Sequence, residues 1–330
     1  PGGAAIGFPM ITFHQNLAPR APDQDAVLAA LHFTDATEAA GLEVPPSAID
    51  EPGAGTEHGA RVAVADYDSD GDQDLFLVGP ERSVGESTSF LFRNDFGRFT
   101  DVADDVGVGL QEAATGAIFA DFDNDGGLDL FVSASNSNLL FRNAGDGEFE
   151  DITRRASISG EAASRLGLFV DLDHDGDLDL YTLADGMNRL YRNNLDGTFA
   201  ELSERMGIAG AGASSRDVAF GDFDEDGDID LVVANLDGSN ALYSNLRQGS
   251  FDDIAEARGV AGGDSTSSVT VGDYDNDGFL DLFLTSLQAG SHTLLRNLGD
   301  GTFELDSRST NLYSRLQTVR ANDAAFLDID

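Results

Sequence analysis

Short apolar runs recur along the chain in pairs, and each pair lies on either side of a cluster of aspartates. The runs are residues 61–65 and 74–78, 116–120 and 130–132, 167–170 and 180–183, and 268–271 and 282–284. Short runs that are rich in β-forming residues predict strands. We therefore expect each aspartate cluster to join two strands.

Two further runs follow each pair. The first ends in Asn about fifteen residues after the aspartate cluster, at 90–94, 139–143, 190–193, 241–245 and 294–297. The second follows a turn and begins with Phe, at 99–102, 149–152, 199–202 and 251–254. These predict a third and a fourth strand, and four short strands in about fifty residues are typical of a propeller blade. Their Phe and Leu side chains are expected to form the core.

The aspartate cluster itself sets the period. An Asp-x-Asp-x-Asp-Gly-x-x-Asp segment begins at Asp66, Asp121, Asp171, Asp222 and Asp273, at intervals of 55, 50, 51 and 51 residues. A sixth begins at Asp328, and the chain ends at Asp330. A constant period of this size indicates stacked repeats. We predict an all-β fold, a β-propeller of four-stranded blades. It is expected to have seven blades when complete, this chain covering five complete repeats and part of a sixth.

The two ends of the chain follow from this register. Residues 32–36, with Gly41 and Leu42 after them, copy the fourth-strand segment at 99–102. The chain is therefore expected to begin its repeats with a last strand that completes the last blade, and to be a piece of a longer protein. Residues 1–30, rich in Pro, Gly and Ala, are predicted to be a linker, and residues 31–330 the propeller.

The spacing of the carboxylates predicts a cation. Counted from the first Asp, carboxylates at positions 1, 3, 5 and 9 surround a tight turn, which Gly at position 6 permits. Each pair of like charges at roughly 4 Å costs on the order of 4 kcal/mol at an effective dielectric near 20. Oxygen ligands alone favour Ca²⁺ over Zn²⁺ or copper, and Mg²⁺ seldom uses an all-protein cage.

An EF-hand opens in a similar way, but two features exclude it. Position 12, where an EF-hand carries Glu, is Leu77, Val132, Thr182, Val233 or Leu284. EF-hand loops also join helices, whereas these loops are flanked by predicted strands.

At these residues the chain resembles the FG-GAP/VCBS repeat family, a propeller type found in integrin α-subunit heads and in many bacterial secreted proteins. Residues 218–234 are similar to its core pattern, and residues 33–42 resemble bacterial relatives of cartilage acidic protein. The resemblance implies Ca²⁺ ligation by side chains at positions 1, 3, 5 and 9 and by the backbone carbonyl at position 7. In this chain the implied ligands are Asp66, Asp68, Asp70, Asp72 and Asp74; Asp121, Asp123, Asp125, Gly127 and Asp129; Asp171, Asp173, Asp175, Asp177 and Asp179; Asp222, Asp224, Asp226, Asp228 and Asp230; and Asp273, Asp275, Asp277, Phe279 and Asp281.

Charge bears on partners and compartment. The net charge is −41, and five Ca²⁺ ions, ten positive charges, would leave −31. This disfavours nucleic acid as a partner. Zero Cys excludes disulfides and thiolate chemistry. Loops of this kind suit free Ca²⁺ of roughly 0.1 to 1 mM, which is found outside cells. We expect secretion or surface display, although no signal peptide or transmembrane segment is visible in this sequence.

No catalytic motif stands out, so no catalytic or organic-cofactor residue is predicted. His174 lies between loop ligands and is expected to be solvated. Three functions stay open: an extracellular Ca²⁺-stabilised adhesion or ligand-binding module, a polysaccharide-active enzyme of lyase type, and a scaffold segment of a larger secreted protein. The first would present blade-linking loops such as residues 81–89 and 261–267 to a protein or glycan. An Arg or His cluster on the central face would favour the enzyme.

Overall fold

The computed structural model describes residues 34–42, 61–79, 88–134, 136–145, 147–158, 164–210, 212–247, 249–262, 265–306, 316, 320–321 and 323–326. Within these residues the chain forms five antiparallel sheets of four strands, each with its strands in sequence order. We call the sheets blades 1 to 5. No helix in the described part of the chain is long and apolar enough to cross a bilayer.

The strands match the predicted runs closely. Blades 1 and 2 contain β1 (Arg61–Ala65), β2 (Asp74–Val78), β3 (Ser89–Asp95), β4 (Arg98–Asp101), β5 (Ala114–Ala120), β6 (Asp129–Ala134), β7 (Leu139–Asn143) and β8 (Phe149–Asp151). Blades 3 to 5 contain β9 (Leu166–Val170), β10 (Asp179–Leu183), β11 (Arg189–Asn193), β12 (Phe199–Glu201), β13 (Ser215–Gly221), β14 (Asp230–Asn235), β15 (Ala241–Asn245), β16 (Phe251–Asp253), β17 (Thr266–Gly272), β18 (Asp281–Ser286), β19 (Thr293–Asn297) and β20 (Phe303–Leu305).

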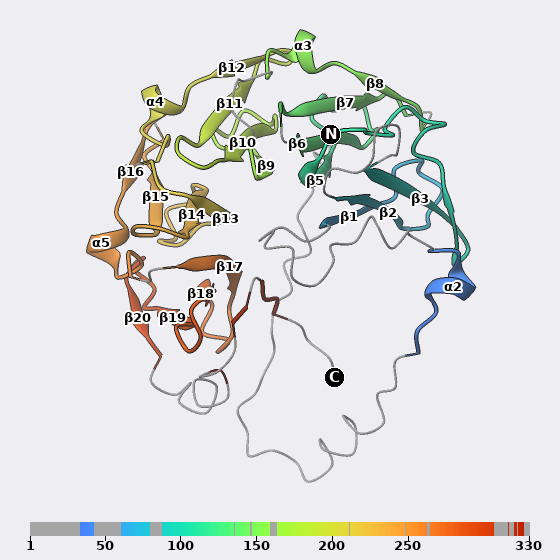
Figure 1. Cartoon of the computed structure of the whole chain (residues 1–330). Coiled ribbons are helices and arrows are strands. Elements are labelled where there is room, and N and C mark those ends of the chain that lie inside the picture. The colour runs from blue at the N-terminus through green and yellow to red at the C-terminus, as the bar shows by residue number, and fades with distance from the viewer. Residues whose placement is uncertain are drawn as a thin grey trace.

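The five blades follow one another around a central axis, with the first strand of each blade innermost and the fourth strand outermost (Figure 1). The inner strands touch in order, β1 with β5, β5 with β9, β9 with β13 and β13 with β17. This arrangement confirms the predicted all-β propeller of four-stranded blades. A total of seven blades stays a prediction, and the sixth segment from Asp328 lies outside the described residues.

The hydrophobic core lies in the seams between neighbouring blades. Between blades 1 and 2, Phe76 on β2 packs edge to face against Phe119 on β5, with ring centroids 6.2 Å apart. Between blades 2 and 3, Phe131 and Phe169 repeat this contact at 6.2 Å. Burying alternate apolar side chains of each sheet against the next one supplies the main favourable free energy of such a fold. The predicted role of the Phe and Leu residues in the core is confirmed.

Short helices outside the sheets were not predicted. They are α2 (Thr37–Ala40), α3 (Thr153–Ala156), α4 (Ser203–Met206) and α5 (Ala255–Arg258), and they lie on the outer rim in Figure 1. The predicted fourth strands extend one residue too far, because Ile152, Leu202 and Ile254 already hold the helix N-cap position. Each helix ends at a residue with left-handed backbone, which turns the chain toward the next blade.

The segment before blade 1 follows the same plan. A Cβ on Gly41, after α2, would lie 2.5 Å from the carbonyl oxygen of Phe99, and Gly207 approaches Phe251 in the same way at 2.8 Å. Residues 37–42 therefore sit on blade 1 as the α4 segment sits on blade 4. No strand is assigned to residues 34–36. Residues 32–33, and the proposed boundary at residue 30, lie outside the described part of the chain.

Candidate metal centres

Each aspartate segment forms the turn between the first two strands of its blade. We call these turns loops 1 to 5, for residues 66–74, 121–129, 171–179, 222–230 and 273–281. Because β1 pairs directly with β2 up to Ala65 and Asp74, the ladder ends where the loop begins. The loops therefore join strands, as predicted, and the exclusion of an EF-hand is confirmed.

Hydrogen bonds to carboxylates curl each loop. In loop 1 the backbone N–H groups of Asp70 and Gly71 donate to the two oxygens of Asp66, each at 3.0 Å, and the N–H of Asp72 donates to Asp70 at 2.8 Å. Gly71 has φ of 98°, and the glycines at position 6 of the other loops have φ between 87° and 97°. The predicted need for glycine is confirmed.

Position 4 has an unexpected conformation. Ser69, Asn124, His174, Glu225 and Asn276 all have φ of 58° or 59°. A left-handed backbone costs a non-glycine residue about 1 kcal/mol or more. Since all five residues, of four different types, take the same conformation, the loop geometry imposes it. The varied residue types at this position hide it from the sequence.

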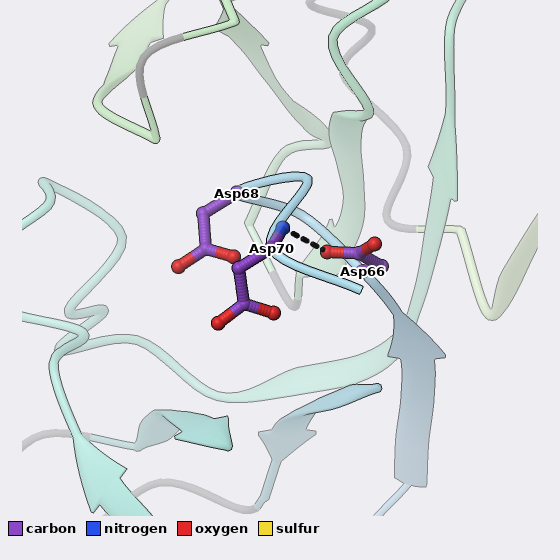
Figure 2. A group of neighbouring side chains, drawn as sticks. All are labelled: Asp66, Asp68 and Asp70. Atoms are coloured by element: carbon purple, nitrogen blue, oxygen red, sulfur yellow. Dashed lines mark hydrogen bonds between the residues drawn. The ribbon is translucent and has the colours of Figure 1, made fainter. Parts of the chain in front are cut away.

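The curled loops bring carboxylates together. In each loop three Asp residues offer one ligand oxygen apiece within 4.8 Å of one another (Figure 2 shows those of loop 1). The groups are Asp66, Asp68 and Asp70; Asp121, Asp123 and Asp129; Asp171, Asp173 and Asp175; Asp222, Asp224 and Asp230; and Asp273, Asp275 and Asp281. Positions 1 and 3 are thus gathered in every loop, and the third member is position 5 in loops 1 and 3 and position 9 in the others.

The ligands predicted at position 7 differ from the others, because the resemblance implies that they bind the ion through their backbone carbonyls and not through their side chains. Their side chains take part in other contacts where they are polar. Asp72 accepts the N–H of Phe96 at 2.9 Å, Asp177 accepts from Asn124 at 3.1 Å, and Asp228 pairs with Arg247. The carbonyls of Asp72, Gly127, Asp177, Asp228 and Phe279 stay predicted ligands.

One buried carboxylate oxygen in each of four loops has no hydrogen-bond donor among the described residues. In loops 1 and 2 it is Oδ1 of Asp68 and of Asp123, at position 3. In loops 3 and 4 it is Oδ1 of Asp171 and of Asp222, at position 1. A buried carboxylate oxygen without a partner costs several kcal/mol unless a cation meets it. The donor set, oxygen only and clustered, therefore fits a hard cation.

The position 9 aspartates are the last residues of the loops and are at most 3% exposed. Burial raises the pKa of Asp74 to about 6, that of Asp129 to about 8, and those of Asp179, Asp230 and Asp281 to about 7. Desolvation is the largest cause in each case, and backbone N–H donors oppose it. A bound cation would return these carboxyl groups to the charged form.

Arginines next to the loops were missed by the sequence reasoning. Arg142 on β7 pairs with Asp123 and Asp125, both at 2.5 Å, and Arg192 on β11 pairs with Asp173 at 3.0 Å and Asp175 at 3.4 Å. These guanidinium groups bind the Oδ2 atoms at positions 3 and 5 and partly offset the repulsion there. The signal was the recurrent Arg-Asn pair at the end of the third strand, which we used only to place that strand.

His174 is half exposed, and its Nε2 lies 3.4 Å from Oδ1 of Asp228 in the next blade. The expectation that it is solvated therefore holds in part. The contact across the seam was not foreseen.

Comparison with known structures gives propeller-like neighbours of low sequence identity. An Agrocybe aegerita lectin, described as recognising non-reducing terminal N-acetylglucosamine, is 19% identical, with a TM-score of 0.46 over 75% of this chain and 65% of that one. The biofilm matrix protein Bap1 of V. cholerae is 17% identical, with a TM-score of 0.44 over 74% of this chain and 38% of that one. The Dos1 propeller is 12% identical, with a TM-score of 0.43 over 70% of this chain and 58% of that one. The chain spans less than two thirds of each of these structures.

No curated protein sequence matches the chain. The pattern of the FG-GAP-like repeat matches it four times, at residues 66–132, 121–182, 171–233 and 222–284. These matches together span about two thirds of the chain, and each one runs from one aspartate loop through the next. With five blades and five such loops in place, the chain belongs to the FG-GAP-like repeat family.

Proposed function

We propose that this protein is an extracellular calcium-binding propeller that presents a ligand-binding surface. The observation that carries the calcium assignment is the buried carboxylate oxygen without a donor in four of the loops. Two oxygens on one Ca²⁺ ion, at 2.3 to 2.6 Å each, lie at most about 5 Å apart. In every loop the three clustered ligand oxygens lie within that span of one another, so that one ion can contact all three. The flexible geometry that Ca²⁺ accepts also suits loops whose third clustered carboxylate differs.

The proposed compartment follows from the ion. Such loops bind Ca²⁺ at concentrations that are common outside cells and rare in cytosol. At tenfold saturation each site adds about 1.4 kcal/mol of stability by mass action, so that five sites rival the stability of a small domain. A fold stabilised in this way suits secretion or surface display.

The proposed ligand surface lies at the end of the propeller away from the metal loops. Because the strands of a blade alternate in direction, the turn between the second and third strands and the connector to the next blade share that end. We call it the connector end. Asn188 there donates its N–H to Ala209, and Ser265 donates to Leu236, at 2.9 and 3.0 Å. These bonds pre-order the surface, which lowers the cost of binding a protein or glycan.

Of the two predicted loops at this end, residues 81–87 and 263–264 lie outside the described residues. The described loops between them carry polar side chains. Asp185 accepts hydrogen bonds from Arg165 and Ser214, and Asp237 accepts the N–H of Ser214 at 2.5 Å. Arg165 holds the pKa of Asp185 below its usual value, so this carboxylate stays charged.

One observation supports the second candidate, a polysaccharide-active enzyme. Arg165 and Arg216 both stand six residues before the first Asp of their loops, next to or at the start of neighbouring inner strands. Arg165 donates to Asp185 at 2.9 Å, and Arg216 also lowers the pKa of that carboxyl. Two arginines near the axis are a feature that a site for an acidic sugar needs.

The proposal is tested by calorimetric titration of chelator-stripped protein with CaCl₂ and by melting with and without EGTA. We expect one ion per described loop and a large fall in Tm with EGTA. No heat of binding together with superimposable melting curves would overturn the calcium assignment. Calcium-loaded protein is then applied to a glycan array and to acidic polysaccharides. Retention without product release supports the binding module, whereas release of unsaturated sugars supports the enzyme.

A further inference from the structure

Four asparagines occupy equivalent positions in the seams between blades. They are the last residues of β7, β11, β15 and β19, and each is at most 4% exposed: Asn143, Asn193, Asn245 and Asn297. We call them the seam asparagines. A buried amide side chain has four hydrogen-bonding positions to satisfy, so its partners reveal what it holds in place.

Each seam asparagine is bound first to the metal loop of its own blade. In blade 4 the N–H of Asn245 donates to Oδ1 of Asp230, at position 9, at 2.9 Å. Its Nδ2 donates to the carbonyl of Ile229, at position 8, at 3.2 Å, and its Oδ1 accepts the N–H of Arg247. The other three asparagines repeat the bond to position 9 at 2.8 to 2.9 Å. In each of these blades the position 9 carboxylate and the seam asparagine of the third strand are therefore held to each other.

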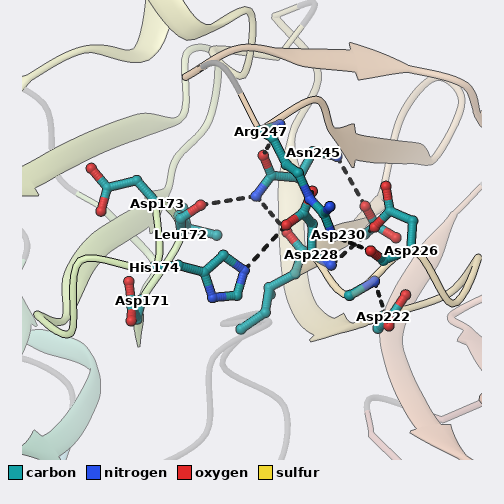
Figure 3. Close-up of polar contacts among 12 residues, drawn as sticks. Asp171, Leu172, Asp173, His174, Asp222, Asp226, Asp228, Asp230, Asn245 and Arg247 are labelled. Carbon is teal, nitrogen blue, oxygen red and sulfur yellow. Dashed lines mark hydrogen bonds and ion pairs between the residues drawn. The ribbon is translucent and has the colours of Figure 1, made fainter.

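The same Nδ2 also reaches the metal loop of the preceding blade. Asn245 donates to the carbonyl of Leu172, at position 2 of loop 3, at 2.8 Å (Figure 3). The other seam asparagines reach the carbonyls of Tyr67, Phe122 and Phe223, each at 2.8 Å. The carbonyl that is held lies between the ligands at positions 1 and 3, so the asparagine constrains both.

The residue at position 2 is in turn bound to its own position 9. Tyr67, Phe122 and Phe223 donate their N–H groups to Oδ2 of Asp74, Asp129 and Asp230 at 3.1 to 3.2 Å, and Leu172 donates to Asp179. Their side chains insert into the following blade, where Phe122 contacts Phe199 and Phe223 contacts Phe303. An unbroken series of buried hydrogen bonds thus runs from Asp74 in loop 1 to Asp281 in loop 5.

Loops 2 and 3 each make a second contact with the loop of the following blade. Asn124, at position 4 of loop 2, donates to Asp177, at position 7 of loop 3, at 3.1 Å. His174, at position 4 of loop 3, lies 3.4 Å from Asp228, at position 7 of loop 4 (Figure 3). Neighbouring loops are therefore joined at their tips as well as at their bases.

We propose that the seam asparagines are positioning residues that couple neighbouring metal loops, so that Ca²⁺ in one loop raises the Ca²⁺ affinity of the loop before it. This inference rests on the calcium binding proposed above. An ion in loop 4 fixes Asp230 and hence Asn245, which then holds the Leu172 carbonyl where loop 3 needs it. Loop 3 loses less conformational entropy when its own ion binds, and this lowers the cost of binding. Reciprocity requires that loop 3 also favour loop 4.

The test follows deuterium uptake of each loop peptide by mass spectrometry during a titration with CaCl₂. This method gives one midpoint of protection per loop. Disabling loop 4 with Asp222→Asn and Asp224→Asn is expected to raise the midpoint of loop 3 about fivefold or more. Asn245→Ala alone should raise it to a similar extent. Adding the loop 4 substitutions to Asn245→Ala should then give a much smaller further shift, because, among the polar contacts of the described residues, only that between His174 and Asp228 still joins the two loops.

Asn94→Ala is the matched control. Asn94 is the second-last residue of β3 and bonds to its own loop through the carbonyl of Gln73 at 2.9 Å, but no described blade precedes it. This substitution should leave the midpoints of loops 3 and 4 unchanged. Asn143→Ala gives an independent measurement in loop 1 when it is made together with Tyr274→Phe. Tyr67 is then the one tyrosine at position 2 of a described loop in a chain without Trp, and it is expected to sensitise the luminescence of Tb³⁺ bound there. The Tb³⁺ midpoint in loop 1 should rise several-fold.

One outcome would contradict the coupling. In it, calorimetry shows that the protein with loop 4 disabled still binds its remaining ions, but loop 3 keeps its wild-type midpoint. The coupling is equally wrong if the loop 4 substitutions shift loop 3 by the same factor with and without Asn245. A wild-type protein in which no loop gains protection would instead overturn calcium binding itself. The wild-type and Asn143→Ala arms decide the matter even if Asn245→Ala fails to fold.

Discussion

Individual residues in this protein show two kinds of carboxylate oxygen. One side chain can carry both, since Oδ2 of Asp222 accepts the N–H of Gly227 at 3.0 Å. Some loop carboxylates are satisfied by backbone N–H donors, as Asp66 is by Asp70 and Gly71. Others, such as Oδ1 of Asp222, are buried without a donor among the described residues. The first kind shapes the loop, and the second kind is available to the proposed ion. Removing a carboxylate of the second kind should therefore affect ion binding more than it affects the fold.

We predict that Asp222→Asn binds one Ca²⁺ ion fewer by calorimetry. In Ca²⁺ at tenfold saturation its free energy of unfolding should fall by at least about 1.4 kcal/mol, because one site no longer contributes and the coupled loop 3 binds its ion more weakly. In EGTA the free energy of unfolding of Asp222→Asn should equal that of the wild type or exceed it slightly, because one source of like-charge repulsion is gone. Asp252→Asn, an equal charge change at an exposed position on β16, is the control and should change neither value. An unaltered ion count in Asp222→Asn would contradict the assignment.

At the scale of elements, the connectors after blades 2, 3 and 4 each contain a one-turn helix, and a similar helix precedes blade 1. Four residues are too few to show helical periodicity, and a helix of this length is not stable by itself. It forms because the fourth strand ends against the preceding ladder, where the N–H of Ile152 still bonds to Leu140 at 2.9 Å. A left-handed residue then turns the chain. That residue is Gly after α2, α4 and α5, and Ser157 after α3.

This natural variation predicts opposite effects for two substitutions. Ser157→Gly should stabilise the protein by about 0.5 to 1 kcal/mol, because glycine takes φ of 63° at little cost. Gly207→Ala should destabilise it by about 1 kcal/mol or more, because its φ is 79° and the new Cβ would lie 2.8 Å from the Phe251 carbonyl. Denaturant unfolding in saturating CaCl₂ measures both. A loss of stability in Ser157→Gly would show that the serine has another role.

At the scale of the whole molecule, the metal ends of all five blades lie on one face, and the buried position 9 carboxyls respond to pH together. In metal-free protein their pKa values of about 6 to 8 lie above the value of about 3.9 expected in the unfolded chain. Folding then takes up protons. The stabilisation from these groups is complete below pH 4 and is lost as pH rises through 6 to 8.

We therefore predict that protein in EGTA has a higher Tm at pH 5 than at pH 8. Its free energy of unfolding should be higher at pH 5 by on the order of 1 kcal/mol per loop. In saturating CaCl₂ the order should reverse, since the ion needs deprotonated ligands and binds more tightly at pH 8. Thermal melts at both pH values, at one ionic strength, check this. A Tm in EGTA that rises steadily from pH 5 to pH 8 would contradict the raised pKa values.

Local sequence patterns predicted much of the secondary structure of this molecule. Strand positions agreed within a residue or two because alternating apolar runs and Asp-Gly turns are local signals, as at β1 and β2 around loop 1. The blade architecture followed from the period of the repeat, and the family from the resemblance of residues such as 218–234 to its motif. The seam asparagines gave no such signal, because their partners in the preceding blade lie more than seventy residues away, as Leu172 does from Asn245.

The sequence by itself determined which residues bring negative charge into each turn and that a cation would have to offset it, because that chemistry lies within nine consecutive residues. Tertiary structure alone decided which carboxylate oxygens are left without donors, and that loops 1 to 4 are each held by an asparagine of the next blade. Those features depend on how one sheet packs against another, and packing joins residues that no local pattern relates.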